Sequence, residues 1–235
     1  MKFLELLDPI QTNTTLNPKL WEPRGRLKAE VRGALLKIAE DFEQFVDIPF
    51  TVEDIVITGS NVNFNYTDKS DLDLHLITDF AALDCAQEAE ELFDTKRHLY
   101  ERDHDIKIYG IPVTLFVEDK NSPGTSAGLY SVANNRWINR PSKIKVKYNL
   151  KEINNMVLVW HTIINNAETL QDLDTAETVL KLVRTYRKLG LKEPEGEFST
   201  PNLVYKLLRN DNSLASLNDL VTKLHDKWLS VSESK

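Results

Sequence analysis

The chain has 235 residues, 41% of them hydrophobic, which is enough for one large domain or two small ones with a proper core. Its formal net charge of −7 excludes a global attraction to nucleic acid, so any RNA or DNA contact must come from a local basic patch. The single cysteine, Cys85, excludes an internal disulfide and suits a reducing compartment. No apolar run approaches the ~20 residues that span a bilayer, and no signal peptide is recognisable, so we expect a cytoplasmic protein without a membrane partner.

The first part of the chain predicts an arm, a helix and two strands. Residues through Leu16 are polar and indicate an arm laid over the body. From Leu27 to Asp47, apolar side chains recur at spacings of three and four, which predicts an amphipathic helix. The β-rich run Ile55-Val56-Ile57-Thr58 predicts a strand. After a polar loop, Asp71-Leu72-Asp73-Leu74-His75-Leu76-Ile77 alternates as a strand with one buried face does.

The middle of the chain predicts a helix, a hairpin and a loop. The helix is expected from about Leu83 to Tyr100. Residues 105–109 and 113–117 predict two strands, joined by a turn at Gly110-Ile111-Pro112. Residues 121–141 are rich in Gly and Pro and predict a loop. Next, Lys143, Lys145 and Lys147 alternate with apolar residues, as on an exposed edge strand whose lysines prevent pairing with another strand.

The last part of the chain predicts helices only, over residues 154–170, 175–189, 201–209 and 214–229. A mixed sheet followed by helices favours the α+β class. We therefore expect two domains: residues 1–140, with a small mixed β-sheet, flanking helices and the N-terminal arm, and residues 141–235, a helical C-terminal domain.

The chemistry is carried by Gly59-Ser60, followed after ten residues by Asp71-Leu72-Asp73. Two carboxylates two apart on a strand project from one face, with Cβ atoms roughly 6–7 Å apart. They can hold Mg²⁺ or Mn²⁺ ions that bridge the oxygens of a triphosphate during phosphoryl transfer. Glycine lets the backbone approach the triphosphate, and the Ser60 hydroxyl can donate to a phosphate oxygen. The alternative is a surface strand with two solvated aspartates.

These residues resemble a known signature. Ile57-Thr58-Gly59-Ser60 and Ser70-Asp71-Leu72-Asp73-Leu74 are similar to the motif of the DNA polymerase β-type nucleotidyltransferase superfamily. The whole chain resembles tailed-bacteriophage proteins labelled nucleotidyltransferase, which would place it in the host cytoplasm. The segments that carry this second resemblance are Leu16-Asn17-Pro18-Lys19-Leu20-Trp21, the core motif ending in His75, Gly196-Glu197-Phe198-Ser199, Asn202-Leu203-Val204-Tyr205-Lys206 and Leu208-Arg209-Asn210.

The resemblance implies a nucleotidyltransferase core in which Asp71 and Asp73 are catalytic and hold the metal, while Gly59, Ser60 and Ser70 contact the nucleoside triphosphate. It also implies a third carboxylate on a later strand, where this chain has Thr114. Threonine is a poor Mg²⁺ ligand and brings no charge.

Substitutes for the third carboxylate are few. Glu118 lies about 13 Å farther along the strand, and Asp105 lies on the preceding one. The superfamily also has a glycine shortly after Gly-Ser, where this chain has Asn61-Val62-Asn63-Phe64-Asn65. These asparagines either hydrogen-bond phosphate or substrate, or cap and turn a short loop.

Lys181, Arg184, Arg187 and Lys188 recur at helical spacing. One possibility is a clamp that binds the triphosphate or an acceptor nucleic acid, with Lys181 and Arg184 as the candidate residues. The other is a solvated helix face. His75 shares the face of the two aspartates and is given no catalytic role. For Phe116, Tyr130 and Trp137 we expect core packing rather than base stacking.

The sequence thus predicts a metal-dependent enzyme that moves a nucleoside monophosphate from a nucleoside triphosphate to a hydroxyl. The acceptor is an RNA, a protein or a small molecule, with RNA favoured. The alternative is a catalytically degenerate protein that binds nucleotide or nucleic acid on the same fold. A third reading is an interaction protein that neutralises a host factor.

Overall fold

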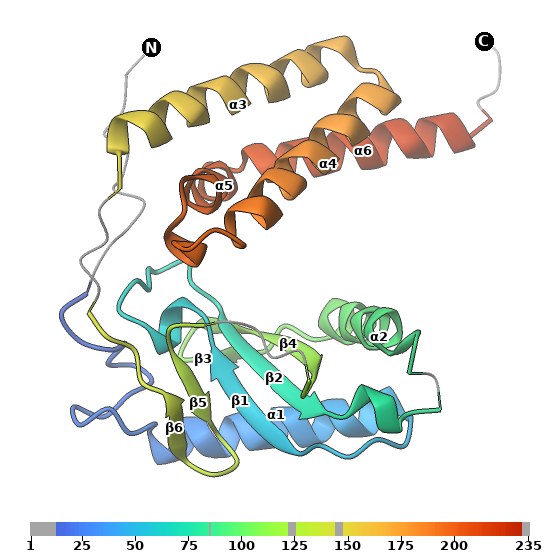
Figure 1. Cartoon of the computed structure of the whole chain (residues 1–235). Coiled ribbons are helices and arrows are strands. Elements are labelled where there is room, and N and C mark those ends of the chain that lie inside the picture. The colour runs from blue at the N-terminus through green and yellow to red at the C-terminus, as the bar shows by residue number, and fades with distance from the viewer. Residues whose placement is uncertain (1–12, 85, 122–125, 144–147, 232–235) are drawn as a thin grey trace. The chain divides into compact units, whose positions relative to one another are not determined.

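The computed structural model describes residues 13–84, 86–121, 126–143 and 148–231 (Figure 1). They fall into two compact units, one within residues 11–144 and one within residues 145–235, and each is described by itself. Cys85, most of the expected arm and the lysine-rich segment at 144–147 lie outside the described residues. No helix in the described part of the chain is long and apolar enough to cross a membrane.

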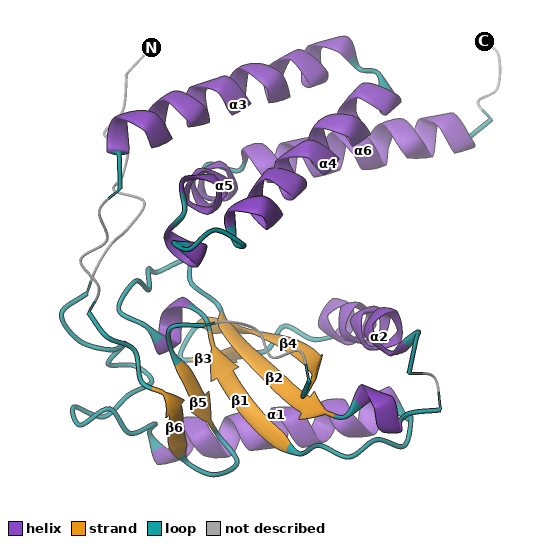
Figure 2. Ribbon diagram, in the orientation of Figure 1, coloured by secondary structure: helices purple, strands orange, loops and turns teal. Residues whose placement is uncertain are grey.

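The first unit contains a mixed β-sheet. Its described residues form six strands in the order β3-β4-β2-β1-β5-β6 (Figure 2). β2 and β4 run parallel and are connected through α2, whereas the other neighbouring strands are antiparallel. The strands are β1 (Asp54–Thr58), β2 (Leu72–Thr78), β3 (Lys107–Ile108), β4 (Ile111–Asp119), β5 (Leu129–Ser131) and β6 (Arg136–Asn139). The sheet and its helices confirm the expected α+β class.

The core of this unit lies on one face of the sheet. Leu72, Leu74 and Leu76 point from β2 into this core and are fully buried. They belong to one hydrophobic cluster with residues of α1 (Ala29–Val46) and α2 (Ala89–Asp103), as the alternation of β2 predicts. Burying each leucine contributes about 1.5–3 kcal/mol, so this register is strongly specified. The opposite face of β2 therefore carries Asp73 and His75.

The expected loop at residues 121–141 is wrong, because part of it forms the hairpin of β5 and β6. These strands are only 3 and 4 residues long, too short for a period-2 pattern to show. They form because β1 offers a free edge to Tyr130 and Ser131. Arg32 of α1 further holds the turn by donating to the carbonyl oxygens of Val132 (2.7 Å) and Ala133 (2.8 Å).

Two boundaries also differ from expectation. The turn between β3 and β4 is Tyr109-Gly110, with φ of 52° and 80°, and Ile111 and Pro112 already belong to β4. α2 begins at Ala89 rather than near Leu83. Upstream of it, the Asp79 side chain accepts from the Ala81 N–H and caps a separate 3₁₀ turn, Phe80–Ala82, after which Leu83 is extended rather than helical.

The second unit confirms the four expected helices, which are α3 (Leu150–Leu170), α4 (Leu173–Gly190), α5 (Thr200–Asn210) and α6 (Ser213–Leu229). Asn149, Asp172 and Ser199 cap the first three with their side chains. The helices enclose their own hydrophobic cluster, which includes Ile153 and Val183.

Candidate functional site

The two halves of the Gly-Ser and Asp-x-Asp motif meet at one end of the β1–β2 pair. These strands are antiparallel, and Thr58 lies opposite Asp73. The chain therefore leaves β1 at Gly59 and Ser60 beside the point where it enters β2. Asp71 immediately precedes β2, and Asp73 is its second residue. Ser60 and Asp71, which are separated by ten loop residues in the sequence, thus become neighbours.

Gly59 makes the closest approach in the site. Its φ is 82°, a left-handed value that side chains other than glycine rarely adopt. A Cβ built on Gly59 would lie 2.2 Å from Oδ2 of Asp73. The Asp73 carboxylate therefore packs directly on the Gly59 backbone. Glycine is needed here for the carboxylate as well as for the turn.

Ser60 and Ser70 close the loop that connects the two strands. The Ser60 hydroxyl donates to Oγ of Ser70 at 2.8 Å, and Oγ of Ser70 also accepts from the Thr67 N–H at 2.9 Å. Ser70 is 7% exposed. In this arrangement the Ser70 hydroxyl is hydrogen-bonded within the loop. Ser60 would have to turn its hydroxyl away from Ser70 to donate to a phosphate.

Asn61 is the centre of a buried network that sequence reasoning missed. Its side chain is fully buried and donates to the carbonyl oxygens of Ser70 (3.2 Å) and Asp71 (2.7 Å). Its Oδ1 accepts from Nδ2 of Asn17 at 2.7 Å, and its carbonyl accepts from Nε1 of Trp21 at 2.9 Å. Asn61 therefore fixes the backbone of Asp71 from inside the protein.

Two of the loop asparagines, Asn61 and Asn63, form hydrogen bonds that hold the loop, as the capping alternative expects. Nδ2 of Asn63 donates to the carbonyl of Gly59, the residue before Ser60, at 2.9 Å. The described end of the arm also contacts this loop, since Asn13 donates to the carbonyl oxygens of Phe64 and Tyr66. The sequence signal for these roles was weak, because an asparagine-rich loop is ordinarily solvated.

The strand next to β2 places Thr114 directly opposite Asp73. Glu118 lies opposite Ile77 instead, and its Oε1 is 3.1 Å from Nδ1 of His75. Asp105 forms an exposed ion pair with Lys107, on the far side of β4 from β2. Within the part of the chain that the structure describes, no three His, Cys, Asp or Glu side chains converge. The described site therefore has two carboxylates.

His75 belongs to a packed column beside the site. Its ring stacks on Phe116 at a centroid distance of 4.6 Å, and the guanidinium of Arg97 lies 5.0 Å from the centre of the Phe116 ring. Phe116 therefore packs on protein side chains, as expected, rather than serving as a surface for base stacking. Tyr130 and Trp137 likewise pack on each other at 5.1 Å.

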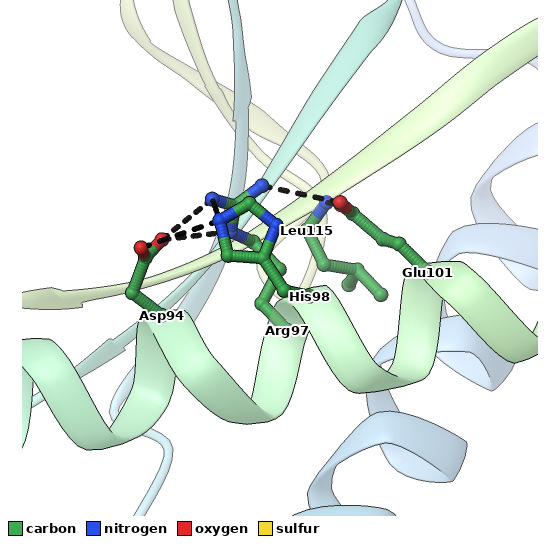
Figure 3. A network of polar contacts seen from close by, with 5 residues as sticks. All are labelled: Asp94, Arg97, His98, Glu101 and Leu115. Atoms are coloured by element: carbon green, nitrogen blue, oxygen red, sulfur yellow. Dashed lines mark hydrogen bonds and ion pairs between the residues drawn. The ribbon is translucent and has the colours of Figure 1, made fainter. Parts of the chain in front are cut away.

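Figure 3 shows the polar contacts of α2 that surround Arg97 and reach Leu115 of β4. Arg97 pairs with Asp94 at 2.5 Å and with Glu101 at 3.1 Å, and the hydrogen bond from Arg97 lowers the pKa of Asp94. Oε1 of Glu101 accepts from the Leu115 N–H at 3.1 Å. The side chain of Glu101 thus satisfies a backbone donor on β4 next to Thr114, which keeps that strand in place.

Lys181 and Arg184 lie in the other unit, on α4, and both are exposed. Arg184 donates to Oδ1 of Asn218 on α6 at 2.9 Å. The structure thus brings together Gly59, Ser60, Ser70, Asp71 and Asp73 and keeps these two cations on a separate body.

Comparisons of the chain with protein-family models, with curated proteins and with solved structures find no match.

The first prediction concerns Gly59. Gly59→Ala and Gly110→Ala each place alanine at a φ near 80°, which costs about 1–2 kcal/mol of stability. A Cβ at Gly110 meets nothing within 4 Å, whereas one at Gly59 meets the Asp73 carboxylate. We expect both variants to unfold at lower denaturant concentration, and Gly59→Ala to lose more stability than Gly110→Ala because its Cβ displaces the Asp73 carboxylate. Equal losses in the free energy of unfolding would contradict this account.

The second prediction concerns Asn61. Asn61→Ala removes the hydrogen bonds that Asn61 forms with Nδ2 of Asn17 and with the carbonyl oxygens of Ser70 and Asp71. We expect a loss of about 2–4 kcal/mol in the free energy of unfolding, because these hydrogen bonds are lost from a buried network. Asn134→Ala, which removes an exposed side chain bonded to Ser131, is the control and should cost less than about 1 kcal/mol. Denaturant unfolding of both variants checks this, and similar losses would argue against a hub at Asn61.

Proposed function

We propose that the first unit binds a nucleoside triphosphate with a divalent cation and transfers the nucleoside monophosphate to a hydroxyl, on a nucleotidyltransferase core. The observation that carries the proposal is the contact between the Asp73 carboxylate and the Gly59 backbone. It joins the Gly-Ser turn and the Asp-x-Asp strand at one sheet end, and both halves of the motif are needed for triphosphate chemistry.

The donor set suits Mg²⁺ or Mn²⁺. Mg²⁺ is held in such sites by one or two carboxylates and completes its shell with phosphate oxygens and water. Asp71 and Asp73 are the residues that would hold it. When bound, the cation neutralises charge on the phosphates and on the leaving pyrophosphate. The residues present therefore fit the cation that the motif implies.

The residues of the chain then have separate roles. The carboxylates of Asp71 and Asp73 repel a triphosphate in the absence of a cation, so nucleotide binding should require the metal. Ser60 donates its hydroxyl to a phosphate oxygen once it releases Ser70. Asn61, in contact with the Asp71 carbonyl, keeps the first carboxylate in position. Preorganised groups of this kind are what transfer through a charged transition state requires.

The test is nucleotide transfer by the whole chain. The protein is incubated with each α-labelled nucleoside triphosphate, Mg²⁺ or Mn²⁺, and bacterial RNA and protein. We expect label on an acceptor with the wild type and a loss of at least about 100-fold with Asp71→Asn or Asp73→Asn, because each substitution removes a metal ligand. Asp105→Asn, which changes an exposed carboxylate paired with Lys107, is the matched control and should retain activity. Transfer that survives in the Asp73 variant would end this proposal.

A second function is favoured by one observation, namely that Thr114 stands opposite Asp73. Without a third carboxylate there, the fold would bind nucleotide or nucleic acid and not turn over. Under this reading the wild type binds a metal–nucleotide complex but transfers no label.

Thr114→Asp separates the two functions. If Thr114 occupies the position of a missing acid, the new carboxylate beside Asp73 should tighten Mn²⁺ binding by about tenfold or more and raise or create transfer. Thr114→Asn has a similar shape without the charge and serves as control. Metal titration followed by calorimetry, with the transfer assay alongside, measures both. No change in metal affinity with Thr114→Asp would show that this position is not part of the site.

A further inference from the structure

The C-terminal half of α4 carries four cations and no carboxylate. Residues 178–190 include Lys181, Arg184, Arg187 and Lys188 but neither Asp nor Glu. In the described residues, none of the four takes part in an ion pair within 4.0 Å. Like charges three and four apart on a helix repel one another, and a bound anion would relieve this repulsion.

Two hollows flank this row of cations. One, of about 380 Å³, lies between α4 and α6, and its lining includes Lys181, Arg184, Lys188, Val221 and one carboxylate, that of Glu177. The other, of about 400 Å³, lies toward α5. Arg184 and Lys188 line both hollows. The cations therefore stand on a ridge with a recess on either side.

The hollow toward α5 combines charge with surfaces on which a base can stack. It is lined by Arg184, Arg187, Lys188, Leu191 and Tyr205. The guanidinium of Arg187 lies 4.6 Å from the centre of the Tyr205 ring, and its Nε donates to Oδ1 of Asn202 at 3.2 Å. These contacts hold the planar group and the ring in place. A fixed aromatic and guanidinium pair among cations matches the way single strands of nucleic acid are bound.

The length of the row favours an extended strand over a lone triphosphate. Lys181 and Lys188 are seven residues apart on a helix, or about 10 Å along its axis. Triphosphate sites converge on one point, whereas a row of cations follows successive phosphates of a strand. Unpaired bases are also needed to reach Tyr205 and Leu191, and single-stranded RNA offers such bases together with ribose hydroxyls.

We propose that the C-terminal half of α4, with Tyr205 of α5, binds single-stranded RNA. The phosphates lie along Lys181, Arg184 and Lys188, and a base stacks in the hollow at Tyr205. Its role as acceptor for the nucleotide rests on the proposed function of the first unit, but the binding itself does not. RNA held by one part of a chain meets the rest of that chain at a raised effective concentration.

The experiment is fluorescence anisotropy of a labelled single-stranded RNA oligomer with the full chain at several salt concentrations. We expect Lys181→Ala/Lys188→Ala to bind about tenfold or more weakly and to reduce the slope of log K against log salt by about 1.4, for two lost phosphate contacts. The matched control is Lys223→Ala/Lys227→Ala, which removes the same charge from exposed positions of α6. It should bind nearly as the wild type does.

Three results would overturn the proposal. They are equal losses in the two double variants, no loss in the α4 variant, and equal affinity for a DNA oligomer of the same sequence. Tyr205→Leu should weaken binding at least about fivefold by removing the stacking surface. Its folding is checked by thermal unfolding, and the α4 variant keeps the test valid if Tyr205→Leu unfolds.

Asp73→Asn separates this proposal from the proposed transfer. It should bind RNA as the wild type does, since Asp73 lies in the other unit. RNA binding through α4 without transfer would leave this proposal standing and remove the enzymatic one. If the wild type transferred label but bound RNA no better than the α4 variant does, the enzymatic proposal would stand and this one would be removed.

Discussion

The antiparallel pairing of β1 with β2 determines where the residues of the candidate site lie. With Thr58 opposite Asp73, the turn that ends β1 and the acids that begin β2 share one end of the sheet. A shift of one residue would turn the leucines of β2 to solvent and its acids into the core. One strand register therefore both buries Leu72, Leu74 and Leu76 and places Asp73 on the opposite face. The contact of Asp73 with Gly59 follows from it and excludes any larger residue at the turn.

Around this pairing, polar contacts rather than apolar packing hold the site loop. Asn61 ties the loop to Asp71 on one side and to Asn17 on the other. Such a network is stable only when every member is satisfied, and it then fixes a geometry more sharply than packed methyl groups do. The column of His75, Phe116 and Arg97 supports the same face of the sheet from β4 and α2. The two carboxylates thus lie between a hydrogen-bonded loop and a packed column of side chains.

The acids of the candidate site and the row of cations on α4 lie in different units. Asp71 and Asp73 lie at one end of the sheet. Among the described residues, the four cations of α4 form no ion pair within 4.0 Å. Each unit has its own hydrophobic cluster, so each of these surfaces is built on an independent core. A local row of cations of this kind is compatible with a net charge of −7 over the whole chain.

The sequence by itself determined the elements whose pattern is local. Spacings of three and four predicted α1 and the four C-terminal helices, and alternation predicted β2 and its buried face. Only the tertiary structure decided the rest. β5 and β6 are too short to show a pattern and exist because β1 has a free edge. The role of Asn61 depends on partners 44 positions earlier and ten positions later in the chain. A hydrogen bond between residues far apart leaves no periodic trace in the sequence, because its partners are brought together only by the packing of the whole sheet.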